Sequence, residues 1–144
     1  MSPAELYDED FYEWTVRNAE LLRCGRASEA DLTHIAEEIE DMGKRERREM
    51  LSRLSVLMAH LLKWQAQPER RSASWMGTIR VQRRDIGKLL GEMPSLRRFL
   101  KDNLAEAYER AITEAAVATG FTENVVPSTC PLSLDAVLDE QYLP

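Results

Sequence analysis

The sequence predicts an all-α fold, an up-and-down helix bundle, and three observations carry this prediction. Apolar residues recur every three or four positions through most of the chain, which is the period of one helix face. Residues that start and stop helices bracket these stretches. No stretch of useful length alternates apolar and polar residues as a half-buried strand would. We therefore expect about four main helices, one of them long and central, and a short C-terminal helix.

The first predicted helix runs from about Asp8 to Cys24. Acidic residues open it, which suits the partial positive charge of a helix N-terminus, and Gly25 is a natural stop. Its apolar residues are Phe11, Trp14, Ala19, Leu21 and Leu22.

A long central helix is predicted from Glu29 to Gln67. Ser28 to Asp31 resembles a capping box, and Pro68 ends the helix because the residue before a proline avoids helical geometry. Two apolar sets stay in phase across Gly43, which favours one helix and leaves open a kink at that glycine. Between residues 54 and 65 the apolar set covers more than half of the helix, so we expect this segment at the centre of the fold.

Three further helices follow, each after a serine. The serine caps that we expect are Ser72 or Ser74, Ser95 and Ser133. The third helix ends at Gly91 and Pro94, and the fourth is closed by Gly120.

Length and composition suit one soluble domain over residues 1–144. No apolar run approaches the roughly 20 residues that a membrane span needs. The acidic N-terminus lacks the basic and then apolar order of a signal peptide, so we expect a cytoplasmic protein with no membrane contact. Cys24 and Cys130 lie far apart and form no metal-ligand spacing, and we expect two small buried thiols.

Charge is distributed unevenly along the chain. Residues 68–101 carry 9 basic and 3 acidic side chains, net +6, while the net charge of the whole chain is −6. The basic segment could bind an anion, or its acidic flanks could neutralise it. Sequence alone leaves both interpretations open.

One helix face offers a set of metal-ligating side chains. His34, Glu37, Glu38 and Asp41 share one side of the long helix, largely opposite its apolar stripe. Di-iron bundles need a Glu-x-x-His motif on two helices, and neither of the two histidines lies three residues after a glutamate. We therefore interpret this face as solvated, and expect no metal and no cofactor.

Several ordered segments together carry a family resemblance. They are residues 10–14 (DFYEW), 37–43 (EEIEDMG), 60–64 (HLLKW), 67–71 with 74–75 (QPERR, SW), 94–96 (PSL) and 130–131 (CP). This combination resembles the bacterial domain-of-unknown-function 29 family over nearly the whole chain. The resemblance implies a helical fold in a bacterial cytoplasm, and it implies no activity, cofactor or catalytic residue.

His60 is the first candidate for chemistry. It lies on the partly buried flank of the long helix, one turn before Trp64. A histidine whose pKa is raised by an acid can act as a general base, with Glu38 or Asp41 as the candidate carboxylates of a hydrolase or nuclease. The alternative is a structural histidine that fixes helix register, and we favour it because no nucleophile or oxyanion pocket is evident.

The basic segment 70–88 is the second candidate. Arg70 and Arg71 precede the N-terminus of the third helix, where backbone N–H groups can cradle a phosphate and Trp75 can wall the site. Arg80 and Arg84 extend the positive face. A phosphate-bearing ligand is one hypothesis. Nucleic acid is possible but not favoured, since an acidic protein gains little from counterion release.

Charged residues interrupt the apolar phase of the long helix at Glu46, Glu49 and Arg53. If they are buried they form an ion network that selects one packing partner, and if they are exposed another chain can dock there. Both interpretations favour an interaction module over an enzyme. Our first hypothesis is a helical protein-interaction module, with a homodimer as one form of it, whose partner the sequence does not identify.

Overall fold

The computed structural model describes all 144 residues and contains seven α-helices, three short 3-10 helices and no strand. The predicted all-α fold with one long helix and a short C-terminal helix is thereby confirmed. Contacts between Cα atoms divide the chain into two compact units, unit 1 (Met1–Arg45) and unit 2 (Glu46–Pro144), which we describe separately. A single domain over residues 1–144 stays a prediction.

The helices in chain order are α1 (Pro3–Glu9), α2 (Phe11–Arg23), α3 (Leu32–Ala66), α4 (Ala73–Glu92), α5 (Leu96–Asp102), α6 (Leu104–Thr119) and α7 (Leu134–Leu138). The 3-10 helices are η1 (Ala27–Glu29), η2 (Pro68–Arg70) and η3 (Glu123–Val125). No helix is both long enough and apolar enough to cross a membrane.

Unit 1 opens with two helices where the sequence predicted one. The prediction of a single helix from Asp8 to Cys24 is wrong because Asp10 leaves helical geometry, with φ −153° and ψ 89°. Its carboxylate accepts a hydrogen bond from the Glu13 backbone N–H, so Asp10 ends α1 and caps α2. An unpredicted capping box between Ser2 and Glu5 starts α1.

The long helix α3 begins three residues later than predicted. Residues 27–29 form η1, and Asp31 rather than Ser28 supplies the N-terminal cap by accepting a hydrogen bond from the His34 backbone N–H. α3 continues without interruption through Gly43, which agrees with the unbroken phase of its apolar residues. It ends one residue before Gln67.

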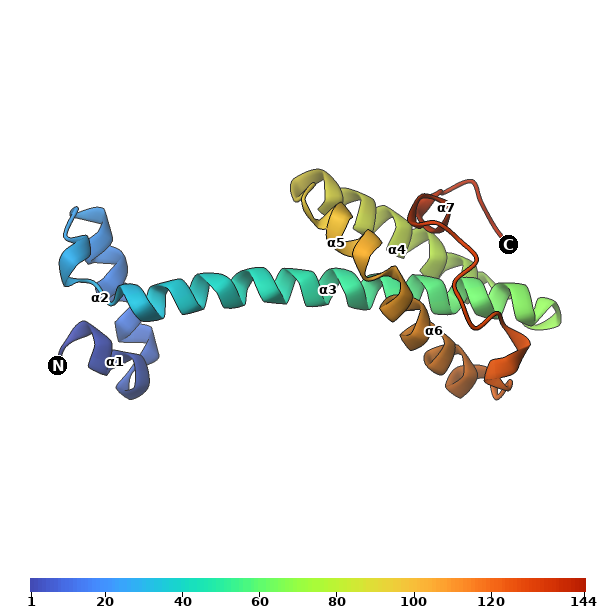
Figure 1. Ribbon diagram of the computed structural model, residues 1–144, viewed down its shortest axis with the longest axis horizontal. Coiled ribbons are helices and arrows are strands. Elements are labelled where there is room, and N and C mark those ends of the chain that lie inside the picture. Colours follow the sequence, from blue (N-terminus) through green and yellow to red (C-terminus); the bar gives the residue numbers. More distant parts are fainter. The chain divides into compact units, whose positions relative to one another are not determined.

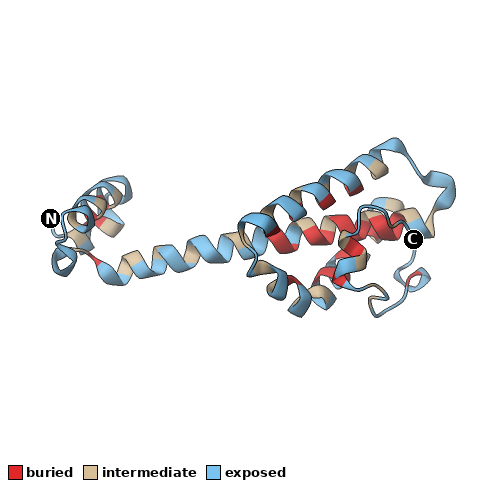
Figure 2. Ribbon diagram, turned by 90° about the horizontal axis from the view of Figure 1, so that it is seen from above, coloured by how far each residue is buried: buried red, intermediate tan, exposed pale blue.

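Unit 2 is built around the C-terminal part of α3. Figure 1 shows α4 and α6 crossing this part at an angle, with α7 beside α4. Buried residues concentrate there and on the facing helices (Figure 2). The largest fully buried side chains are Met50, Leu54, Leu57, Ile79, Ile86, Leu100 and Val137. The predicted centre of the fold, residues 54–65, is confirmed as the core of this unit.

The later helices follow the predicted caps in part. Ser72 and Ser133 each accept a hydrogen bond from the backbone N–H three residues on, as N-terminal caps do. The predicted fourth helix is wrong in its continuity, since it breaks at Asn103 into α5 and α6. The Asn103 side chain donates to the Phe99 carbonyl, and such local bonds compete with the helix ladder. Ser95 makes no side-chain cap.

The cysteines differ from the prediction of two buried thiols. Cys24 is exposed at the end of α2, whereas Cys130 is half-buried against the core of unit 2. Burial raises the pKa of the Cys130 thiol, so this group stays protonated and behaves as a small apolar side chain.

Replacing two glycines of unit 2 by alanine should change the free energy of unfolding in opposite directions. Gly120 ends α6 in the left-handed region at φ 76°, where a Cβ is strained, while Gly87 lies inside α4 with open space around it. We expect Gly120→Ala to lower the free energy of unfolding by about 1 kcal/mol and Gly87→Ala to raise it by roughly 0.5–1 kcal/mol. Urea denaturation followed by circular dichroism measures both. Equal effects of the same sign would contradict the assignment of these two positions.

Candidate functional site

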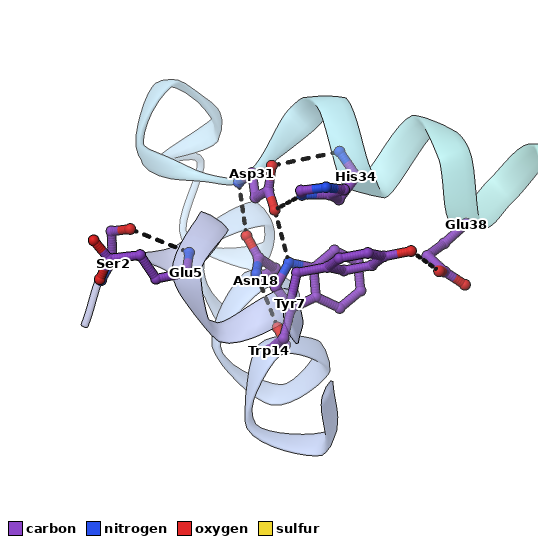
Figure 3. Close-up of polar contacts among 8 residues, drawn as sticks. All are labelled: Ser2, Glu5, Tyr7, Trp14, Asn18, Asp31, His34 and Glu38. Atoms are coloured by element: carbon purple, nitrogen blue, oxygen red, sulfur yellow. Dashed lines mark hydrogen bonds and ion pairs between the residues drawn. The ribbon is translucent and has the colours of Figure 1, made fainter. Parts of the chain in front are cut away.

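The buried carboxylate of Asp31 organises unit 1. Its Oδ2 accepts a hydrogen bond from Trp14 Nε1 at 2.9 Å and lies 2.6 Å from His34 Nδ1 (Figure 3). Asn18 extends the network, because its Oδ1 accepts from the Asp31 backbone N–H at 2.8 Å and its Nδ2 donates to the Trp14 carbonyl at 2.9 Å. A charge this deeply buried is stable only when it is paired and hydrogen-bonded. The network therefore ties α2 to the start of α3.

Aromatic rings close this network on the side of α1. The Tyr7 ring stacks on the His34 ring with 3.8 Å between centroids and 8° between planes. Tyr7 also meets Trp14 edge to face, and its hydroxyl donates to Glu38 Oε1 at 2.5 Å. Figure 3 shows these side chains reaching from α1 and α2 onto one side of α3. Of the predicted candidates, the structure brings Glu38 and His34 into one cluster.

Ionisation in this cluster is coupled to its hydrogen bonds. The bond to Asp31 raises the pKa of His34 and outweighs partial burial, which alone would lower it. Burial raises the pKa of the Asp31 carboxyl, but the bonds from Trp14 and His34 together lower it below its usual value. The bond to Glu38 raises the pKa of Tyr7 to about 12. Below the raised pKa of His34, the cluster is therefore a protonated imidazole paired with a carboxylate.

An apolar stripe of α3 lies beside this cluster and is not covered within unit 1. Its members, Leu32, Ile35, Ile39 and Met42, follow the spacing of a coiled-coil seam. Ile39 is 63% exposed, Met42 60% and Leu32 52%. We call these four residues the α3 stripe. Ile35 is half-buried, whereas the other three members face solvent. Three exposed apolar neighbours on one helix face are unusual, because such a face ordinarily drives packing.

His60 lies in unit 2, in a polar setting of its own. Its Nδ1 is 2.8 Å from the Val56 carbonyl, so this nitrogen carries the proton, and Nε2 lies 3.4 Å from Lys63 Nζ. Burial lowers the pKa of His60, the bond to Val56 opposes this only in part, and Lys63 adds to the lowering. The predicted carboxylates, Glu38 and Asp41, belong to unit 1. The hydrolase hypothesis stays a prediction, with a neutral imidazole as its starting point.

Lys63 was missed by sequence reasoning. It is 7% exposed and its ammonium lies 5.2 Å from the centre of the Trp75 ring, so the predicted ligand residue Trp75 already contacts a cation of this chain. Burial lowers the pKa of Lys63, and Glu114 opposes this lowering. The only signal for it in the sequence was its place among the apolar residues 61–64.

Arg70 and Arg71 contact the ends of helices rather than an open site. Arg70 Nη1 donates to the Thr119 carbonyl at 2.9 Å, at the last residue of α6. Arg71 Nε donates to the Trp64 carbonyl at 2.8 Å, in the last turn of α3, and its guanidinium lies over the Trp64 ring. Cations suit the carbonyl-rich, partly negative C-terminus of a helix. Both arginines therefore have structural partners.

Arg80 and Arg84 have no such structural partners. They line an open hollow beside α4 together with Arg83, Glu140 and Gln141, and neither has a carboxylate within salt-bridge distance. Arg83 is buried and was not predicted, although its spacing from Ile79 and Ile86 places it on the buried face of α4 and was a signal for this. The predicted basic segment thus divides into two capping arginines and an arginine-lined hollow.

Two of the charged residues that interrupt the apolar pattern of α3, Glu49 and Arg53, form ion pairs inside unit 2. Arg53 Nη2 lies 3.2 Å from Glu49 Oε1, and its Nη1 lies 3.4 Å from Asp85 Oδ2 on α4. The Arg53 side chain is 31% exposed, so this is a half-buried ion network. No group of three or more histidine, cysteine, aspartate or glutamate side chains gathers in a way that holds a metal ion.

Fold and site together define an all-α protein with an acidic N-terminal unit, a long shared helix and a helical C-terminal core. The chain belongs to the family described as Domain of unknown function DUF29, whose model matches residues 6–143. The resemblance found in the sequence is thereby confirmed. No curated protein and no solved structure matches the chain.

The two histidines provide a direct test of this electrostatic account. We expect the pKa of His34 to lie above about 6.5 and that of His60 below it. Since the raised pKa belongs to a base, the stabilisation from protonated His34 is fully present below pH 6.5 or so and is lost as pH rises through the folded-state pKa. NMR titration of the two imidazole Cε1–H signals measures both values.

Asp31→Asn is the matched change for this titration. It should return the pKa of His34 toward about 6.5 while the pKa of His60 stays where it is, because the two rings lie in different units. An unchanged His34 titration in a folded Asp31→Asn protein would show that the pair does not set this pKa.

Proposed function

We propose that the protein is a helical interaction module whose unit 1 docks a basic amphipathic helix of another protein on the α3 stripe. The observation that supports this most strongly is the exposure of that stripe. Its spacing suits a helical partner, which would place its own apolar residues between those of α3. On another side of the same segment, the Tyr7 ring of α1 stacks on His34 of α3, which ties α1 to this helix.

Charge favours a basic partner. Unit 1 carries 12 acidic and 5 basic side chains, net −7. Complementary potentials speed association and suppress wrong partners, while like charges cost free energy. A second copy of the chain would bring the same net −7 to the interface, so a homodimer through this face is disfavoured. A helix rich in lysine or arginine and apolar on one side fits better.

The other functions considered have weaker support. A hydrolase needs a base with a reactive group beside it, whereas His60 Nε2 faces an ammonium. Nucleic acid would have to overcome the acidic surface of unit 1. We therefore propose a binding protein rather than an enzyme, acting in the bacterial cytoplasm as the resemblance implied.

A designed peptide provides the first test. The probe is a fluorescent 18-residue helix of leucine and lysine with its leucines on one face, and the comparison peptide has the same composition in scrambled order. We expect the amphipathic peptide to bind the full chain more tightly, as read from fluorescence anisotropy. Ile39→Glu with Met42→Glu should weaken that binding at least tenfold, since each exposed apolar side chain contributes roughly 1–2 kcal/mol on burial.

Val117→Glu is the matched control. Val117 is 82% exposed on α6 of unit 2, so the same substitution adds a charge without touching the α3 stripe. Binding should be unchanged in this variant. Equal weakening by Val117→Glu, equal binding of the scrambled peptide, or a concentration-dependent dimer lost in the Ile39→Glu, Met42→Glu protein would each contradict the proposal.

A further inference from the structure

The hollow beside α4 has an unusual lining. It has a volume of about 340 Å³, and three arginines, Arg80, Arg83 and Arg84, line it with Glu140 and Gln141 of the C-terminal segment. This volume lies at the small end of the range for ligand sites, which is roughly 300–1,000 Å³. All five residues belong to unit 2, so the hollow does not depend on how unit 1 is placed.

Arg83 is the buried member of the lining. It is 4% exposed, and it donates from Nε to the Val137 carbonyl at 2.8 Å and from Nη1 to the Tyr142 carbonyl at 2.7 Å. These bonds hold the C-terminal segment against α4. Its Nη2 is buried and has no hydrogen-bond partner. Because Nη2 is closed off from solvent, it cannot contact a ligand in the open hollow, and Arg83 contributes its positive charge and its hold on the C-terminal segment instead.

Arg80 and Arg84 supply the exposed part of the charge. They are four residues apart, so their side chains lie on the same side of α4. Neither has a carboxylate within 4.0 Å, although other exposed arginines of unit 2 do, such as Arg97 with Asp135 and Arg98 with Asp102. Two exposed guanidinium groups without a carboxylate partner thus border one hollow, together with the positive charge of a third arginine.

The charges of the lining select the ligand class. Three guanidinium groups and one carboxylate give the lining a net charge of +2. A phosphate monoester carries close to two negative charges at pH 7 and offers three acceptor oxygens, whereas a phosphodiester carries one. We propose that this hollow binds a small phosphate monoester, with its phosphate held by the exposed guanidinium groups of Arg80 and Arg84 and attracted by the charge of Arg83 behind them. This site is independent of the α3 stripe.

The test uses the full chain and two probes, glycerol 3-phosphate as the monoester and dimethyl phosphate as the diester, at constant ionic strength. Glycerol 3-phosphate should give saturable shifts of the Arg83 Nε–H and Gln141 backbone signals in NMR titrations. Arg80→Gln with Arg84→Gln should weaken this binding at least about tenfold, because charge-assisted hydrogen bonds to the phosphate are lost. Both side chains are exposed, so this protein should keep its fold.

Arg97→Gln with Arg98→Gln is the matched control, since it removes the same charge from unit 2 at another surface. Binding should be unchanged in that protein. Non-saturable shifts, equal binding of dimethyl phosphate, or equal weakening by the control pair would overturn the proposal, the last two by pointing to general attraction of anions. The α3 stripe variants leave this site intact, so the two proposals fail separately.

Discussion

Unit 1 depends on one buried charge, the carboxylate of Asp31. Removing a carboxylate from water costs several kcal/mol unless its oxygens are fully paired, and here Trp14, His34 and the first turn of α3 all donate to it. These donors come from α2 and α3, so satisfying the charge fixes how the two helices meet. The side of α3 that carries His34 therefore packs within unit 1. The apolar residues Ile39 and Met42 lie on another side of the helix and are exposed.

In unit 2 the cations are satisfied in a different way. Of the 9 basic residues in segment 68–101, Arg97 and Arg98 form salt bridges with acidic residues of the C-terminal flank. Arg70, Arg71 and Arg83 donate to backbone carbonyls instead. Carbonyls at helix ends and in the C-terminal segment accept these bonds without cancelling the charge. Arg80 and Arg84 are the arginines of this segment that have neither a carboxylate nor a carbonyl partner, and both lie at the hollow beside α4.

The sequence predicted the fold class, the long helix and the core at residues 54–65. These features follow from the spacing of many apolar residues together, so no single residue decides them. It did not predict the breaks at Asp10 and Asn103, which depend on one side chain competing with the helix ladder. The sequence predicted only some of the residues of the candidate sites. Arg80 and Arg84 were found from their spacing, but Lys63 and Arg83 were missed because burial of a long cation depends on which helices meet. The sequence did not predict that the α3 stripe is exposed, because its apolar spacing is the same as that of a buried helix face.

The central claim is that the α3 stripe is covered by a basic helix of another protein. A photo-crosslinking amino acid at position 39, with position 40 of the same helix as control, tests it most directly in living cells. The account predicts that position 39 links to one defined segment with a helical apolar pattern and an excess of lysine and arginine, and that position 40 does not. Links from position 39 to an acidic segment, to a second copy of the chain, or to the same products as position 40 would contradict it.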